Sequence, residues 1–294
     1  MVYPAGPADL PGGRGGHRSG TMRDVKLYCR DLSWDGSGRP ACAGAPRRVL
    51  SDAAPCFRDA PSARGTIPGE VMMQQILPSA VACVDTTADI PDAPTAPEEA
   101  AALEACTEPR RREFTTTRHC ARTAMAALGV PPAGIPSGPK GEPRWPAGLI
   151  GSMTHCDGYR AAALSRASDL HAMGIDAEPH RPLPPGVLDS ISVPAEREHL
   201  RSLEREFPEV HWGTVMFSAK ETVYKVFNPL TGRWLGFRDA RMTFDPGAGT
   251  FRARLLVPGP VVDGKRLTWL TGHWSLREGL VLTALAVRRG RAAR

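Results

Sequence analysis

Long hydrophobic runs are missing from this chain of 294 residues. No apolar stretch approaches the roughly 18 residues that a membrane-spanning helix needs, and residues 1–20 lack the apolar centre of a secretion signal. The seven cysteines form no C-x-x-C pair, and cysteine and histidine pairs with zinc spacing are absent. We therefore expect a soluble cytoplasmic protein with free thiols and no membrane segment.

Aromatic residues are also few, at 6% of a chain whose formal net charge is +6 and whose pI is near 9.1. A basic chain favours anionic partners, but it does not choose among phosphates, nucleic acid and acidic proteins. Single-strand binders interleave aromatic side chains with their arginines, and this chain does not. This counts against a basic nucleic-acid-binding protein, which stays an alternative. Steep salt-dependent binding to random DNA would support it.

The beginning of the chain lacks a hydrophobic period. Residues 1–71 are rich in glycine, proline, arginine and serine. We expect them to be disordered because they offer little apolar surface to bury. The pair Met72 and Met73 is expected to mark the beginning of the folded unit.

Helix and strand patterns follow from there. Apolar segments bounded by turn residues predict strands at 75–85, 149–156, 159–166 and 170–179, and hairpins at 240–257 and 267–287. Helical spacing predicts helices at 97–107, 109–129, 193–207 and 210–228, the last ending before Pro229. The proline-rich residues 130–148 are predicted to form a loop.

This order of elements predicts an α+β protein. We expect two similar α/β subdomains, residues 72–173 and 174–294, related by pseudo-twofold symmetry, with the active site in the cleft between them. The hydrophobic content of 41% is sufficient for a substantial core at this length.

The stretch GIDAEP, residues 174–179, places two carboxylates in an apolar strand. Because side chains alternate between the faces of a strand, Asp176 and Glu178 point the same way. Such a pair by itself is also compatible with a solvated surface, so its meaning depends on what lies nearby.

A second charged group occurs in FSAKETVYKVF, residues 217–227, where Glu221 and Lys225 share one helix face and Lys220 precedes Glu221. A surface salt bridge of this spacing contributes only ~0.3–0.5 kcal/mol. The apolar residues around these charges indicate a buried helix instead. Three carboxylates and two lysines suit a magnesium ion that bridges protein and phosphate, with the lysines at the phosphate.

Two further groups are candidates. His155 follows the hydroxyl residues Ser152 and Thr154, and a single histidine there is as compatible with a structural role as with a functional one. Arg110, Arg111 and Arg112 lie at a helix start, where a solvated basic face is the plain alternative.

The segments KGEPRWP, GSMTHC, GIDAEP and FSAKETVYKVF, in this order and with these gaps, resemble the 4′-phosphopantetheinyl transferases of the surfactin- and enterobactin-synthetase-activating type. The resemblance covers residue 72 to the C-terminus. It implies a magnesium-dependent, monomeric enzyme that uses coenzyme A as co-substrate. Such an enzyme transfers phosphopantetheine to a serine of an apo acyl, polyketide or peptidyl carrier protein and releases 3′,5′-ADP.

The resemblance also implies roles for individual residues. The metal ligands correspond to Asp176, Glu178 and Glu221, and the catalytic residues to Glu221, Lys225 and His155. The contacts to coenzyme A correspond to Arg111, Arg112, Lys140, Arg144, Thr154, His155, Lys220 and Lys225. The loop departs from the better-known G-K-P form, since Gly141, Glu142 and Pro143 stand there between Lys140 and Arg144.

The chemistry fits these residue types. The carrier serine must attack the phosphorus nearest the pantetheine while 3′,5′-ADP leaves, which requires alignment and neutralisation of charge. Glu221 is our candidate acceptor of the serine proton. A magnesium-dependent phosphohydrolase, with water as the nucleophile, uses the same acids and stays a second alternative.

Overall fold

The computed structural model describes residues 71–104, 106–139 and 141–290. The disorder predicted for residues 1–71 concerns, apart from Val71, residues outside the described ranges, and Lys140 also lies outside them. Within these ranges, every helix is too short or too polar to span a bilayer.

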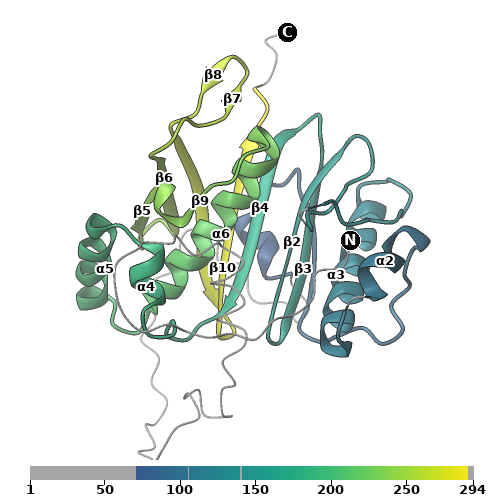
Figure 1. The fold of residues 1–294 in the computed structure, drawn as a ribbon, viewed down its shortest axis with the longest axis horizontal. Helices are drawn as coiled ribbons and strands as arrows, with labels where there is room; N and C mark the ends of the chain where they lie inside the picture. Colours follow the sequence, from purple (N-terminus) through teal and green to yellow (C-terminus); the bar gives the residue numbers. More distant parts are fainter. Residues whose placement is uncertain (1–70, 105, 140, 291–294) are drawn as a thin grey trace, which may run out of the picture.

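Two antiparallel sheets lie side by side and meet in the middle of the molecule, where β4 runs next to β2 (Figure 1). The three-stranded sheet has the order β1-β3-β2, with bounds Ala82–Thr86, Tyr159–Arg166 and Leu149–Cys156. The five-stranded sheet has the order β4-β10-β9-β6-β5, with bounds Leu170–Pro179, Leu280–Arg288, Trp269–Arg277, Thr250–Leu255 and Ala240–Asp245. A short ribbon pairs β7, Val261–Val262, with β8, Lys265–Arg266.

The helices divide between the two sheets. The described α-helices are α2, Ala100–Glu104; α3, Glu108–Ala127; α4, Val187–Ile191; α5, Pro194–Glu206; and α6, Trp212–Thr231. The short 3₁₀ turns are η1, Met73–Ile76; η2, Pro97–Glu99; and η3, Phe237–Asp239. Helix α3 packs on β3 and β1, whereas α6 packs on β4 and β10. The fold is therefore α+β, as predicted, with the helices covering one side of each sheet.

Most predicted elements are confirmed. The strands expected at 149–156, 159–166 and 170–179 coincide with β2, β3 and β4, and both hairpins are present. The two sheets differ in strand number, so the pseudo-twofold symmetry stays a prediction. The cleft between the subdomains also stays a prediction. The boundary placed between residues 173 and 174 falls inside β4, all of which belongs to the five-stranded sheet.

Two element bounds differ from the prediction. Helix α6 does not end before Pro229 but continues to Thr231, where Gly232 caps it with a φ of 66°. A proline in the last turn removes only one terminal hydrogen bond, and the left-handed glycine then ends the helix. The strand expected at 75–85 begins only at Ala82, because Met73–Ile76 form a 3₁₀ turn that Pro78 follows.

Side chains, rather than a backbone ladder, join the two sheets. The main-chain N–H of Ile175 donates to Ser152 Oγ at 3.1 Å, and that of Ala177 donates to Thr154 Oγ1 at 3.1 Å. The Lys225 ammonium adds bonds to the carbonyls of Met153 at 3.3 Å and Ile175 at 2.8 Å. We call this junction of β2 and β4 the seam. The hydroxyls of β2 thus satisfy the edge of β4 that its sheet leaves open.

A glycine in β4 allows α6 to lie close to the seam. A Cβ atom on Gly174 would lie 2.5 Å from the carbonyl oxygen of Thr222 and 3.2 Å from the Cβ of Lys225. The first contact is with helix backbone, which cannot turn aside as a flexible side chain does. Gly174 is therefore required by the close approach of α6 to the strand that carries Asp176.

The start of α6 is held by two histidines. The main-chain N–H of His211 donates to His180 Nε2 at 3.0 Å, and the two rings lie 4.7 Å apart. Burial lowers the pKa of His180, with a further lowering by His211 and an opposing effect of Glu209. Burial also lowers the pKa of His211. A neutral His180 ring is the form that can accept this hydrogen bond.

We predict that Gly174→Ala lowers the free energy of unfolding by about 1–3 kcal/mol, as overpacking commonly does, because α6 must move away from β4. Denaturant unfolding measures the change. Gly247→Ala is the matched control, since a Cβ there meets only Asp245 Oδ1 at 3.5 Å. If Gly174→Ala were as stable as the control, the proposed close approach would be wrong.

We also predict that acid destabilises the chain through His180. Its pKa is lowered in the folded state, so the unfolded chain takes up the proton more readily, and stability is complete above the ordinary value of 6.5. That stability is lost as the pH falls through the lower, folded pKa. Unfolding of wild type and His180→Asn, compared at about pH 7.5 and about pH 5.5, should show a smaller loss in the variant, which keeps an acceptor but does not titrate. Equal losses would contradict this role.

Candidate active site

Asp176 lies at the point where β4, β2 and α6 meet, and its side chain has no exposed surface. Its Oδ1 accepts the Lys225 ammonium at 2.8 Å and the Thr154 hydroxyl at 3.2 Å. Its Oδ2 accepts the Ser218 hydroxyl at 2.9 Å. One cation and two hydroxyls thus compensate the charge of the buried carboxylate. Without these donors, its burial would be strongly unfavourable.

The other two predicted acids approach the same region. Glu178 lies two residues further along β4, on the face that Asp176 shares, and is half-buried. Glu221 belongs to α6, which packs on β4, and its residue is only 4% exposed. In the part of the chain that the structure describes, no three histidine, cysteine or acidic side chains are gathered closely enough to be a formed metal centre. As carboxylate oxygens, the donors nevertheless fit a hard cation such as magnesium.

The two lysines of α6 contact different acids: Lys225 contacts Asp176, and Lys220 contacts Glu196. Lys225 points to the seam, where its ammonium contacts Asp176 and two carbonyls. Lys220 is 2% exposed, and its ammonium lies 2.8 Å from Glu196 Oε1, 2.6 Å from the Phe237 carbonyl and 3.0 Å from the Ala240 carbonyl. The structure therefore does not bring Lys220 to Asp176, in contrast to the phosphate contact expected from the sequence.

The reason lies in Glu196, the buried acid of α5. Besides Lys220, it accepts the main-chain N–H groups of Val193 at 2.8 Å and Met242 at 2.7 Å. Burial lowers the pKa of the Lys220 ammonium, and the Glu196 carboxylate opposes that shift. The pair joins α5, α6 and β5, so Lys220 acts as a structural link.

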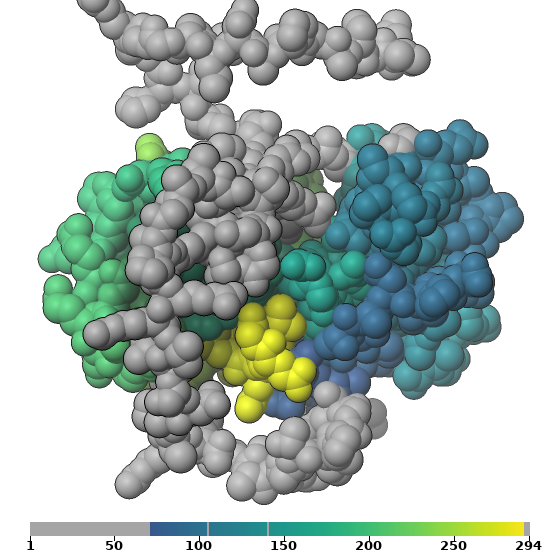
Figure 2. Space-filling model, turned by 90° about the horizontal axis from the view of Figure 1, so that it is seen from below, coloured from purple at the N-terminus to yellow at the C-terminus, as the bar shows by residue number. Residues whose placement is uncertain are grey.

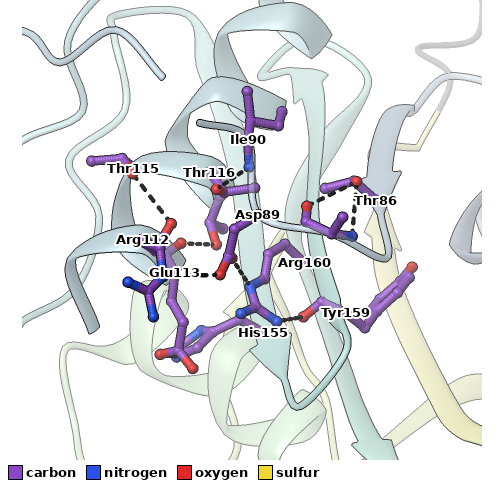
Figure 3. A network of polar contacts seen from close by, with 12 residues as sticks. Thr86, Asp89, Ile90, Arg112, Glu113, Thr115, Thr116, His155, Tyr159 and Arg160 are labelled. Carbon is purple, nitrogen blue, oxygen red and sulfur yellow. Dashed lines mark hydrogen bonds and ion pairs between the residues drawn. The ribbon is translucent and has the colours of Figure 1, made fainter. Parts of the chain in front are cut away.

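His155, at the end of β2, lies beside the start of α3. Its Nε2 is 3.2 Å from Glu113 Oε2, and Arg110 donates to the same carboxylate oxygen at 3.1 Å. The guanidinium of Arg110 also contacts His155 Nε2 directly. In Figure 3, Glu113 points from α3 towards the ring of His155. The three side chains form one polar cluster that includes Arg110 rather than Arg111 or Arg112.

Arg111 and Arg112 lie further out, with side chains 45% and 51% exposed. Arg111 pairs with Glu108 at 3.8 Å, and Arg112 pairs with Glu108 at 3.2 Å and with Asp89 at 3.6 Å. Asp89 Oδ1 in turn accepts a hydrogen bond from Nε of the buried Arg160 at 2.8 Å (Figure 3). Arg112 therefore connects Glu108 to Asp89. The spacing of Arg110 and Glu113, three apart on one helix, is the sequence signal that would have identified their pairing.

The remaining predicted residues separate into two groups. Thr154 is 2% exposed and uses its hydroxyl on Asp176 and the seam, which makes it part of the support of Asp176. Arg144 is exposed in the loop at 130–148, where its main-chain N–H donates to Pro136. Lys140, in the same loop, lies outside the described residues.

A buried acid attaches this loop to α3. Glu99 has no exposed surface, accepts the N–H of Ile135 at 2.9 Å and pairs with Arg122 at 2.9 Å. Arg118 donates to the Ile135 carbonyl at 2.9 Å, and burial lowers its pKa to about 10. The loop is thus attached through Ile135 to Arg118 of α3 and to Glu99, which pairs with Arg122 of the same helix.

The candidate site lies at one end of the molecule. The main-chain N–H of His180, just after β4, donates to the carbonyl of Gly279 in the turn between β9 and β10 at 2.7 Å. Figure 2 shows this end, with that turn (yellow) and residues of β2 and β3 (teal) between the helical parts of the two halves. Each half therefore contributes predicted site residues, Asp176 and Glu178 from β4 of the five-stranded sheet and His155 from β2 of the three-stranded sheet.

Comparisons with known proteins agree with this arrangement. Residues 98–165 match the model of the 4′-phosphopantetheinyl transferase N-terminal domain, and residues 172–260 match that of the 4′-phosphopantetheinyl transferase superfamily. The chain is similar to 4′-phosphopantetheinyl transferase Svp of Streptomyces mobaraensis, with 51% identity over 219 residues, which is 74% of this chain and 89% of the relative.

Two further relatives are similar over almost their whole length. The chain is 47% identical to 4′-phosphopantetheinyl transferase PptT of Mycobacterium tuberculosis, over 74% of this chain and 98% of the relative. It is 45% identical to 4′-phosphopantetheinyl transferase Npt of Nocardia iowensis, over 73% of this chain and 99% of the relative. Residues 166–171 separate the two matches; they comprise the last residue of β3, the connection and the first two residues of β4.

We predict that Lys220→Met lowers the free energy of unfolding by about 3–5 kcal/mol, because it leaves Glu196 buried without its cation. Urea unfolding measures this. Lys265→Met, on the exposed β8, is the control and should change little. A Lys220→Met protein of normal stability with weakened coenzyme A binding would instead support the phosphate contact expected from the sequence.

Proposed function

The chain belongs to the 4′-phosphopantetheinyl transferases, enzymes that transfer phosphopantetheine to carrier proteins, and we propose how its own residues perform this reaction. Coenzyme A is the co-substrate, and a serine of the apo carrier protein is the acceptor. Support comes from the similarity over nearly the full length of three relatives and from a buried aspartate where the two halves meet. Nothing among the relatives favours a phosphohydrolase or a nucleic-acid-binding protein.

Asp176, Glu178 and Glu221 are the residues that we assign to a magnesium ion. Two of them share a face of β4, and the third is presented by the helix that packs on that strand. Magnesium, when bound, neutralises charge on the pyrophosphate oxygens of coenzyme A. Because the acids come from β4 and α6, their relative placement depends on how α6 is held against β4.

The cationic groups are assigned to the phosphates. The Lys225 ammonium lies beside Asp176 and supplies positive charge to the pyrophosphate as the bond to 3′,5′-ADP breaks. His155 and Arg110 form one cluster at the end of β2, and we assign them, with Arg112, to the nucleotide phosphate. Arg111, Arg144 and Lys140 are further candidates for contacts to coenzyme A. Lys220 is assigned to the fold.

The transfer itself requires one bond to form and one to break. The serine oxygen of the carrier forms a bond to the phosphorus nearest the pantetheine, while the bond from that phosphorus to the oxygen of 3′,5′-ADP breaks. The serine proton passes to Glu221, our proposed base. The leaving group keeps the bonding electrons as a phosphate oxygen, whose charge the cationic groups stabilise.

The partner is a carrier protein of the acyl, polyketide or peptidyl class, which one copy of the enzyme can serve as a monomer. One chain supplies all the assigned residues. We place the reaction in the cytoplasm because the four cysteines among the described residues are all free thiols, which suits a reducing compartment.

We predict that incubation of an apo carrier with this enzyme, coenzyme A and magnesium adds one phosphopantetheine group, measured as the intact mass of the carrier. Asp176→Ala should abolish the addition because the cation loses a ligand. Lys225→Ala should slow it by about 2–3 kcal/mol of transition-state stabilisation, the usual effect of losing one positioned charge donor.

Asp169→Ala, at the opposite end of β4 and exposed, is the control and should transfer at the wild-type rate. Turnover of Asp176→Ala within a few-fold of wild type would contradict its role as a ligand. Release of nucleotide from coenzyme A without a carrier would indicate the phosphohydrolase instead.

A further inference from the structure

Three buried hydroxyls form a chain that ends on Asp176. The Ser218 hydroxyl lies 2.9 Å from Asp176 Oδ2 and 2.9 Å from the Thr283 hydroxyl. The Thr283 hydroxyl lies 2.7 Å from that of Thr222. All four side chains have no exposed surface. None of the three hydroxyl residues has a role predicted from the sequence.

The fold explains why the four side chains meet. In the ladder between β10 and β4, Thr283 stands directly opposite Asp176, so both side chains lie on the same face of the sheet. Ser218 and Thr222 are four residues apart on α6, which packs on this face. One turn of the helix therefore covers one cross-strand pair.

The direction of the chain follows from its end. An ionised carboxylate can only accept, so the single proton of Ser218 is donated to Asp176. The Ser218 oxygen must then accept from Thr283, and the Thr283 oxygen must accept from Thr222. Each hydroxyl polarises the next, which strengthens the final bond to the carboxylate.

The hydroxyls also complete the grip on the carboxylate. Lys225 and Thr154 hold Oδ1, whereas Ser218 holds Oδ2. With donors on both oxygens, the carboxylate cannot rotate about its bond to Cβ without breaking a hydrogen bond. Alanine and valine at these three positions would bury no hydroxyls, so packing alone gives no reason for them.

We propose that Ser218, directed by Thr283 and Thr222, is a positioning residue that fixes the orientation of the Asp176 carboxylate for the divalent cation. The proposal rests on the assignment of Asp176 as a metal ligand made above. It explains why a serine stands in FSAKE: its hydroxyl connects this segment to the aspartate of GIDAEP. Partners of this kind orient a ligand and are expected to affect metal affinity by about 10–100-fold when removed.

The test measures metal binding without turnover. Mn²⁺ is titrated into the full chain with coenzyme A present and carrier absent, and the free ion is followed by electron paramagnetic resonance. Ser218→Ala should weaken Mn²⁺ binding about 10–100-fold. Thr222→Val, at the far end of the chain, should weaken it less.

Ser165→Ala is the matched control. Ser165, in β3 of the three-stranded sheet, is equally buried and donates its hydroxyl to the carbonyl of Ala80 in the turn before β1, so its removal should leave Mn²⁺ affinity unchanged. In turnover assays, raised magnesium should restore the rate of Ser218→Ala, while the KM for the carrier stays at the wild-type value. A purely structural role of Ser218 would not give this rescue.

Other outcomes separate this inference from the proposed function. If Asp176→Ala bound Mn²⁺ as tightly as wild type, the proposed metal site itself would be wrong. If Asp176→Ala lost the ion but Ser218→Ala kept it, only the role of Ser218 would be overturned. If Ser218→Ala does not fold, Ser218→Cys replaces it, because the thiol is a weak donor. Its Mn²⁺ affinity should lie between that of wild type and that of Thr283→Val. Wild-type Mn²⁺ affinity in both Ser218→Cys and Thr283→Val would overturn the proposal.

Discussion

The buried charge of Asp176 is the constraint on which the rest of the structure depends. A carboxylate without exposed surface is tolerated only where the protein itself supplies donors. Those donors come from β2 through Thr154 and from α6 through Ser218 and Lys225. If β2 or α6 moved away from β4, which carries Asp176, the charge would be left poorly compensated. The residue assigned to the cation therefore also fixes the geometry in which the cation is held.

Helix α6 shows how one segment serves both fold and site. Lys220 and Lys225 are five residues apart, so they leave the helix in different directions, one to Glu196 and the other to the seam. Ser218 lies on the side of Asp176, and Gly174 removes the Cβ that would keep the helix away. A short sequence motif thus contains a residue that attaches the helix to α5 as well as residues that contact Asp176.

Much of this could be predicted from the sequence, because local rules determine it. The bounds of β2, β3 and β4 follow from apolar runs between turn residues, and the alternation of strand side chains correctly placed Asp176 and Glu178 on one face. The end of α6 was missed because a cap at Gly232 outweighs a proline in the last turn. The contacts of Lys220 with Glu196, of Arg110 with His155 and of Ser218 with Asp176 could not be predicted, because each joins residues that are distant in sequence. Spacing gives the direction of a side chain on its own element, but not what another element brings to it.

At the seam, side chains set the separation between the two halves. A continuous ladder would set the distance between β2 and β4 by backbone geometry, which substitutions of side chains scarcely change. Here two hydroxyls and one ammonium set it. Single substitutions of these side chains can therefore change the separation between His155 on β2 and Asp176 on β4.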